Sequence, residues 1–159
     1  MPQSKTTIIV RKAVAADTAA VLALYRELRP NDPPIEDARI ATLWQEVAEG
    51  PRSSILVAEY EQEVAATCML AFLPNLASDG RPIGVIEHVV TAHRFRRRGL
   101  SKKLLEFALA VAWRANCCKV CLLSGAQRTV AHDLYKAVGF DGDVERGFVA
   151  KPGTSSYKV

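Results

Sequence analysis

A strand-like run that leads through a basic turn into a long amphipathic helix is the feature of this sequence that most constrains its fold. Val85 to Thr91 is dominated by β-branched residues, which predicts a buried strand. Leu100 to Asn116 predicts a helix, because its apolar residues recur at helical spacing. The apolar stripe of that helix consists of Leu100, Leu104, Phe107, Ala108 and Val111. Such a pair favours a sheet with helices packed on its faces.

Strand-like and helix-like patterns alternate along the rest of the chain as well. Further helices are predicted at Thr18 to Leu28, Glu36 to Glu49 and Thr129 to Val138. Further strands are predicted at Lys5 to Lys12, Ser54 to Tyr60, Glu63 to Phe72, Lys119 to Ser124 and Val144 to Ala150. The order β-α-α-β-β-β-α-β-α-β predicts an α/β or α+β fold with a central mixed sheet.

The composition is that of an ordered, globular protein. The chain has 159 residues, of which 49% are hydrophobic and 24% charged, and this composition excludes a disordered chain. A chain of this length predicts a single domain over residues 1–159. No apolar run approaches the ~20 residues that span a bilayer. The first residues lack the apolar core of a signal peptide, so we expect a cytoplasmic protein with no membrane partner.

Positive charge is concentrated in one short stretch, from Arg94 to Lys103. The formal net charge is +4, from 21 Lys and Arg against 17 Asp and Glu. Six of the 21 basic residues lie in this stretch, which contains no acid, so the rest of the chain has 15 basic and 17 acidic residues. The local excess indicates an anion site. That anion is either a phosphate-bearing cofactor or nucleic acid bound by the Arg94–Lys103 cluster.

The cysteines do not predict a metal site. Cys118 and Cys121 form a C-x-x-C pair, but neither a second pair nor a pair of histidines follows. In a strand these two side chains would point to opposite faces of the sheet. We therefore expect reduced, buried thiols and no bound metal.

The basic turn has the features of a pyrophosphate cradle. The first amides of a helix have no partner within the helix and carry the positive end of its dipole, so an anion placed there accepts hydrogen bonds from them. Gly99 lets the backbone approach a phosphate closely, and the small Ser101 adds a hydroxyl donor. The turn matches neither G-x-x-x-x-G-K-[ST] nor G-x-G-x-x-G.

Two motifs resemble a known family. Arg96-x-x-Gly99-x-Ser101 resembles the (Q/R)-x-x-G-x-(G/A) acetyl-CoA signature of the GCN5-related N-acetyltransferase (GNAT) superfamily, with Ser101 where the family prefers Gly or Ala. The segment Ala131–Phe140 resembles the A-x-x-(F/L)-Y-x-x-x-G-F helix ending of the same family. The resemblance implies a central mixed, mostly antiparallel sheet of six to seven strands, flanked by about four helices. It also implies acetyl-CoA as co-substrate and direct attack of an amine on the thioester in a ternary complex.

The resemblance also implies a set of site residues. Tyr135 would protonate the departing coenzyme A thiolate, and the backbone N–H near Val90 would bind the acetyl carbonyl. Glu87 is the candidate base, although an edge-facing solvated glutamate explains its place equally well. His88 should point to the opposite face from Glu87, unless a bulge at Val89–Val90 reverses that assignment. The predicted coenzyme contacts are Val89, Val90, Thr91, Arg96, Arg97, Arg98, Gly99, Leu100, Ser101, Lys102 and Arg128.

Three functions stay open for this sequence. The first is an acetyl-CoA-dependent N-acetyltransferase acting on a primary amine, for which we expect a small-molecule acceptor. The second is a nucleic-acid-binding module that uses the Arg94–Lys103 cluster, and the third is a non-catalytic relative that binds coenzyme A. Under the first function nucleic acid is not an expected partner. A homodimer is possible, since dimers are common in the family. Arg128 departs from the asparagine that many relatives place at that position.

Overall fold

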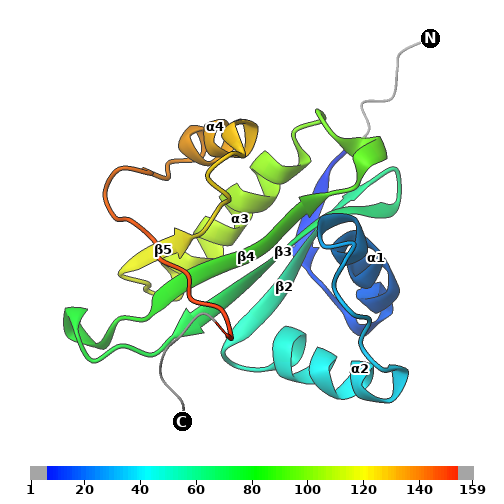
Figure 1. Ribbon diagram of the computed structural model, residues 1–159, viewed down its shortest axis with the longest axis horizontal. Coiled ribbons are helices and arrows are strands. Elements are labelled where there is room, and N and C mark those ends of the chain that lie inside the picture. Colours follow the sequence, from blue (N-terminus) through cyan, green and yellow to red (C-terminus); the bar gives the residue numbers. More distant parts are fainter. Residues whose placement is uncertain (1–6, 154–159) are drawn as a thin grey trace. The chain divides into compact units, whose positions relative to one another are not determined.

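The computed structural model of the protein describes residues 7–153 (Figure 1). The chain divides after Leu122 into two compact units. Within the described residues, the first unit contains a five-stranded sheet with three α-helices, and the second contains one α-helix.

The sheet is mixed and mostly antiparallel, as predicted. Its strands lie in the order β1-β2-β3-β4-β5, with antiparallel pairing from β1 to β4 and parallel pairing between β4 and β5. The strands are β1 (Ile9–Lys12), β2 (Ser53–Tyr60), β3 (Glu63–Leu73), β4 (Ile83–Thr91) and β5 (Lys119–Leu122). The tight turn between β2 and β3 places Glu61 and Gln62 in left-handed conformations.

Helices cover both faces of this sheet (Figure 1). On one face lie α1 (Thr18–Leu28) and α2 (Asp37–Trp44), and a π-helical turn over Gln45–Glu49 extends α2. On the other face α3 (Leu100–Arg114) packs against β2, β3 and β4. Strand alternation explains the division, because Ile55 and Val57 pack with Val21 of α1, whereas Leu56 between them points to the α3 face.

Short 3₁₀ turns join several of these elements. They cover Ala15–Asp17, Ser78–Gly80 and His93–Phe95. The first is anchored by Asp17, whose carboxylate accepts hydrogen bonds from the Val14 amide and the Arg11 guanidinium. The Arg11 guanidinium holds the pKa of Asp17 below its ordinary value, so the carboxylate stays charged although it is buried.

The second unit differs most from the sequence prediction. Its helix α4 (Thr129–Ala137) lies where a helix is predicted, but Val144 to Ala150 forms no strand. Val144, Phe148 and Val149 are exposed instead. β-propensity describes how a residue fits a paired surface, and within the described residues this segment has no strand partner. Gly147 weakens a strand further, and it lies so close to Leu123 that any Cβ would clash.

The predicted six to seven strands are therefore too many, and the described residues form five. The predicted first strand began at Lys5, which lies outside the described residues, and the observed strand begins at Ile9. Among residues 7–153, no helix combines the length and apolarity needed to cross a membrane.

Candidate active site

An irregularity in β4 shapes one side of the candidate site. In the register of β3 with β4, Thr67 pairs with Val90 and Met69 pairs with Glu87. Cys68 therefore faces two residues, His88 and Val89, which is the pattern of a β-bulge. His88 has a left-handed backbone, with φ of 55°. The bulge predicted at Val89–Val90 is present one residue earlier.

The bulge brings Glu87 and His88 to the same face of the sheet. Glu87 pairs with Met69, which in turn pairs with Ile55 of the cluster beneath α1 and α2. The ring of His88 lies 5.1 Å from the ring of Tyr25 on α1. The opposite faces expected for His88 and Glu87 in an unbroken strand are therefore not observed, and the reversal expected from a bulge is, because the extra residue reverses the alternation.

The end of β4 is linked directly to the start of α3. Val90 is buried, and the hydroxyl of the next residue, Thr91, lies 2.6 Å from the hydroxyl of Ser101. The serine that departs from the family signature therefore has a specific partner. This hydrogen bond links the end of β4 to the first turn of α3.

The loop between β4 and α3 exposes a row of backbone amides. Arg97 and Gly99 are left-handed, with φ of 62° and 79°. Gly99 is the N-cap of α3, with no side-chain cap, and the Lys103 amide donates to the Gly99 carbonyl at 3.2 Å. The amides of Leu100, Ser101 and Lys102 therefore have no acceptor within the helix. This geometry suits a bound anion.

The arginines of the basic cluster are not equivalent. Arg94 forms an ion pair with Glu63 and lies 4.5 Å above the ring of Phe95. Arg98 donates to the Tyr60 hydroxyl at 3.0 Å and lies 5.0 Å above its ring.

Three other basic side chains of the cluster are available to a ligand. Among the described residues, no hydrogen bond or ion pair is made by the side chains of Arg97, Lys102 and Lys103. The guanidinium of Arg96 is only 3.5 Å from the His93 imidazole, at the limit of a hydrogen bond.

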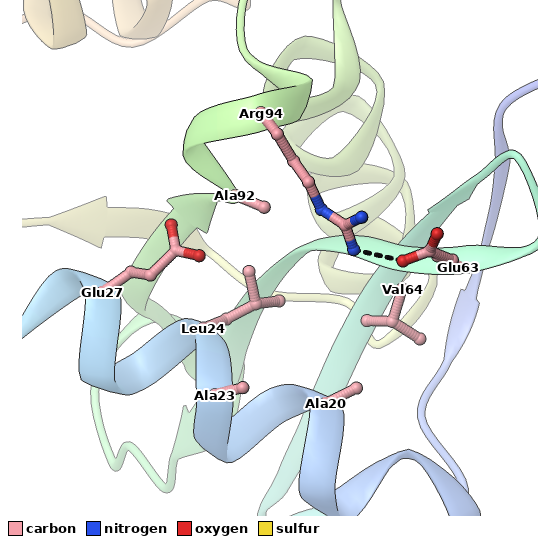
Figure 2. Close-up of a pocket in the computed structure, with 8 residues that line it drawn as sticks. All are labelled: Ala20, Ala23, Leu24, Glu27, Glu63, Val64, Ala92 and Arg94. Atoms are coloured by element: carbon pink, nitrogen blue, oxygen red, sulfur yellow. Dashed lines mark hydrogen bonds and ion pairs between the residues drawn. The ribbon is translucent and has the colours of Figure 1, made fainter.

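A pocket of about 320 Å³ lies on the α1 side of the sheet, near the start of β3 and just past the end of β4 (Figure 2). Its rim carries Glu27, Glu63 and Arg94, and the last two form the ion pair drawn in Figure 2. Glu27 accepts the His93 backbone amide at 2.9 Å. None of the predicted catalytic or coenzyme-binding residues lines this pocket, and its polar rim already has protein partners.

In the second unit, Tyr135 is buried near the end of α4. Its ring lies 6.2 Å from that of Phe140, and its carbonyl accepts the Phe140 amide at 3.0 Å. Gly139 makes this ending possible with φ of 103°. At the other end of the helix, Arg128 is the N-cap, and its amide donates to Gly125 at 3.0 Å.

Sequence reasoning missed Tyr25 and Tyr60. Tyr25 reads as one more member of the apolar stripe of α1, and Tyr60 as a strand residue. Burial raises the pKa of the Tyr25 phenol, and its hydroxyl has no hydrogen-bond partner among the described residues. The four cysteines are free, and within residues 7–153 no group of His, Cys, Asp or Glu is arranged to hold a metal ion.

Solved structures of other proteins resemble this chain. No curated protein matches the sequence. Among solved structures, a protein from Agrobacterium tumefaciens, provisionally described as an acetyltransferase, is 32% identical with a TM-score of 0.83, covering 90% of this chain and 99% of that one. Glucosamine-6-phosphate N-acetyltransferase from Arabidopsis thaliana is 25% identical with a TM-score of 0.78, covering 91% and 97%. An aminoglycoside N-acetyltransferase solved with CoA is 16% identical with a TM-score of 0.78, covering 96% and 99%, and shows the fold alone.

The family model gives the assignment. Residues 19–140 match the model of the acetyltransferase (GNAT) family, and this range includes the β4 bulge, the arginine loop and α4. The match spans more than half of the sequence, and the Agrobacterium structure is similar over nine-tenths of it. The chain therefore belongs to the GNAT acetyltransferase family.

Proposed function

We propose that the protein is an acetyl-CoA-dependent N-acetyltransferase that moves the acetyl group to a primary amine by direct attack in a ternary complex. The observation that carries the proposal is the row of amides at the start of α3, which have no acceptor within the helix. They follow the loop of residues 92–99 that joins β4 to α3. Arg97 and Lys102 lie next to them in the chain, without a protein partner among the described residues.

The residues present fit the coenzyme. A pyrophosphate requires several convergent donors and positive charge, and the amides of Leu100, Ser101 and Lys102 supply the donors. Arg96, Arg97 and Arg98 supply charge, and Arg128 remains a predicted contact from the second unit. The left-handed Gly99 has nothing within 4 Å of the position of a Cβ, so the approach to these amides is open.

The chemistry follows from which protein groups can move protons. Bound acetyl-CoA supplies an acetyl thioester. An alkylamine has a pKa near 10.4, so only about one in a thousand is neutral at pH 7, and a base is useful. Glu87 on the α1 face would accept the ammonium proton, a backbone N–H near Val90 would donate to the acetyl carbonyl oxygen, and Tyr135 would protonate the thiolate.

The acceptor in this proposal is a small-molecule amine. The Arabidopsis neighbour is named for glucosamine 6-phosphate and another for aminoglycosides, and both are amines on sugars. A cytoplasmic location and a homodimer stay part of the proposal.

The structure gives one reason to place nucleic-acid binding second. Two of the six basic side chains in the cluster, Arg94 and Arg98, are already bound to Glu63 and Tyr60. Phosphate contacts dominate nucleic-acid affinity, so a cluster reduced in this way would give a small footprint.

Thermal unfolding with and without acetyl-CoA tests the proposal, with ATP and NAD as polyanion controls. At 100 times its dissociation constant, a ligand stabilises the folded state by about 2.7 kcal/mol. In a domain of this size we expect Tm to rise by about 5–10 °C.

Of the three ligands, only acetyl-CoA should raise Tm by this full amount. An equal rise with ATP or NAD would return the loop to a generic anion patch. A rise without turnover on any amine of a panel would instead support the non-catalytic, coenzyme-binding function.

A further inference from the structure

We infer that His88 is a second proton-accepting residue of the acceptor site, beside Glu87. The inference rests on the proposed function, because it concerns the proton that the acceptor amine must lose. It adds a residue for which the sequence predicted no role in catalysis.

The backbone of His88 is strained. A non-glycine residue in the left-handed region is strained and persists only where the surroundings hold it. His88 has φ of 55° inside β4, where regular strand geometry was available. The outcome of this strained conformation is specific. It places the imidazole on the α1 face together with Glu87, whereas an unbroken strand would turn it toward α3.

The imidazole of His88 packs against an aromatic ring of α1. One side of the ring lies against Tyr25, with ring centroids 5.1 Å apart and planes at 59°. His88 is only half-buried, so the ring is held on one side and open on the other. Among the described residues, neither ring nitrogen has a hydrogen-bond partner, so both are available to a ligand or a water.

Several ionisable groups lie around the His88 ring. From α1 these are Tyr25 and, at the helix end, Arg29, which forms an ion pair with Asp32 and feels the charge of Glu87. From β4 the ionisable group is Glu87. Cys68 of β3 lies opposite the bulge, but it pairs with Leu56, so its side chain points to the α3 face.

Only some of these groups carry charge near neutral pH. Burial raises the pKa of both Tyr25 and Cys68, so both stay neutral there. The charged groups are Glu87 and the Arg29–Asp32 pair. The negative Glu87 on the same face favours a cationic ammonium, and then the imidazolium that forms when the ring takes the proton.

The chemistry balances without any further reactant. The ammonium N–H bond breaks, its proton moves to a neutral imidazole nitrogen, and the electron pair stays on the amine. That pair then forms the bond to the acetyl carbon as the thioester bond to sulfur breaks. The nitrogen loses a second proton as the amide forms, and the departing thiolate takes up one proton. Of the two protons that leave the nitrogen, the imidazole therefore accounts for one and the thiol for the other.

The decisive experiment is chemical rescue in a His88→Gly variant. Glycine adopts left-handed backbone freely, so the variant removes the imidazole and keeps the bulge. The assay follows thiol release from acetyl-CoA with the best amine from a panel of amino sugars, amino acids and aminoglycosides. We expect kcat/KM to fall about 100-fold and free imidazole to restore at least part of it.

Matched variants separate this role from a structural one. Asn116→Gly also replaces a left-handed residue, with φ of 59°, outside the proposed site, and should keep wild-type activity and show no response to imidazole. Acetyl-CoA affinity should stay the same in both variants.

The outcomes distinguish the inference from the proposed function. If the wild type acetylates an amine but His88→Gly keeps its activity, His88 only packs against Tyr25 and the inference is overturned. The same holds if imidazole fails to rescue a folded His88→Gly variant. If the wild type binds acetyl-CoA and acetylates none of the amines, the proposed function and the inference both fail.

Discussion

The bulge in β4 and the loop that follows it both hold a non-glycine residue in a left-handed conformation, His88 at φ of 55° and Arg97 at 62°. In the bulge the strained backbone aims a side chain, because the His88 ring lies against Tyr25. In the loop it aims the main chain, because the residues after Arg97 present amides with no acceptor in α3. Under the proposed function, similar backbone strain serves proton transfer in one region and anion binding in the other.

This comparison separates two kinds of variant. Where a side chain carries out the chemistry, its removal should reduce turnover and leave coenzyme affinity unchanged. Where the main chain binds the anion, side-chain changes should act on affinity through charge and access.

Tyr135→Phe should have the largest effect on turnover. If the Tyr135 hydroxyl protonates the thiolate, its removal should lower kcat by about 100-fold or more. Acetyl-CoA affinity, measured by calorimetry, should change little, because Phe keeps the ring contact with Phe140. Wild-type turnover in this variant would return Tyr135 to a packing role at the end of α4.

Charge reversal in the arginine loop should have the next largest effect, and on affinity. Arg97→Glu with Arg98→Glu should weaken acetyl-CoA binding about 10- to 100-fold, since a hydrogen bond to a charged group contributes about 1.5–3 kcal/mol. Arg97→Glu alone should account for most of this loss, because Arg98 is already bound to Tyr60.

Calorimetric titration of acetyl-CoA measures that affinity, and Lys12→Glu, an exposed charge reversal on β1, is the matched control. Equal losses in the two single loop variants would show that the contact with Tyr60 does not persist when coenzyme binds. An unchanged affinity in the double variant would remove the argument for a pyrophosphate cradle.

The sequence predicts the segment from β4 to α3 well because its signals are local. Gly99, the run of arginines and the apolar stripe of the helix are consecutive features, and each determines the structure of its own neighbourhood. The position of the bulge was predicted one residue too late, because it depends on how β3 pairs with β4 around Cys68. Pairing register is a long-range property that β4 alone does not encode.

The contacts that divide the arginine cluster are also long-range. Arg98 contacts Tyr60, and Arg94 contacts Glu63. Both partners lie in the hairpin of β2 and β3, far from the cluster in the sequence. Nothing in the spacing of the cluster identifies these partners. The strand predicted at Val144–Ala150 is wrong for a related reason, since local β-propensity does not supply a neighbouring strand.

The Thr91–Ser101 hydrogen bond tests whether the strand and the helix are coupled. Ser101→Ala should lower the free energy of unfolding by about 1 kcal/mol, because Thr91 loses its partner. Adding Thr91→Val should cost less than the sum of the two single changes, since both polar partners are then removed together. Urea unfolding of the four proteins measures this, and strict additivity would mean that the two hydroxyls do not interact.

The smallest effect should come from relieving the backbone strain itself. Arg97→Gly removes a left-handed penalty of about 1–2 kcal/mol and adds about 0.5–1 kcal/mol of lost chain entropy, so it should leave the protein slightly more stable. His88→Gly removes a similar penalty but also loses the ring contact with Tyr25, worth about 0.5–1.5 kcal/mol, so its net effect should be near zero or destabilising. Urea unfolding resolves the difference between the two. If His88→Gly were the more stable variant, the contact with Tyr25 would not hold the imidazole in place. The bulge and the loop would then be alike, each with a strained residue whose side chain has no stabilising contact.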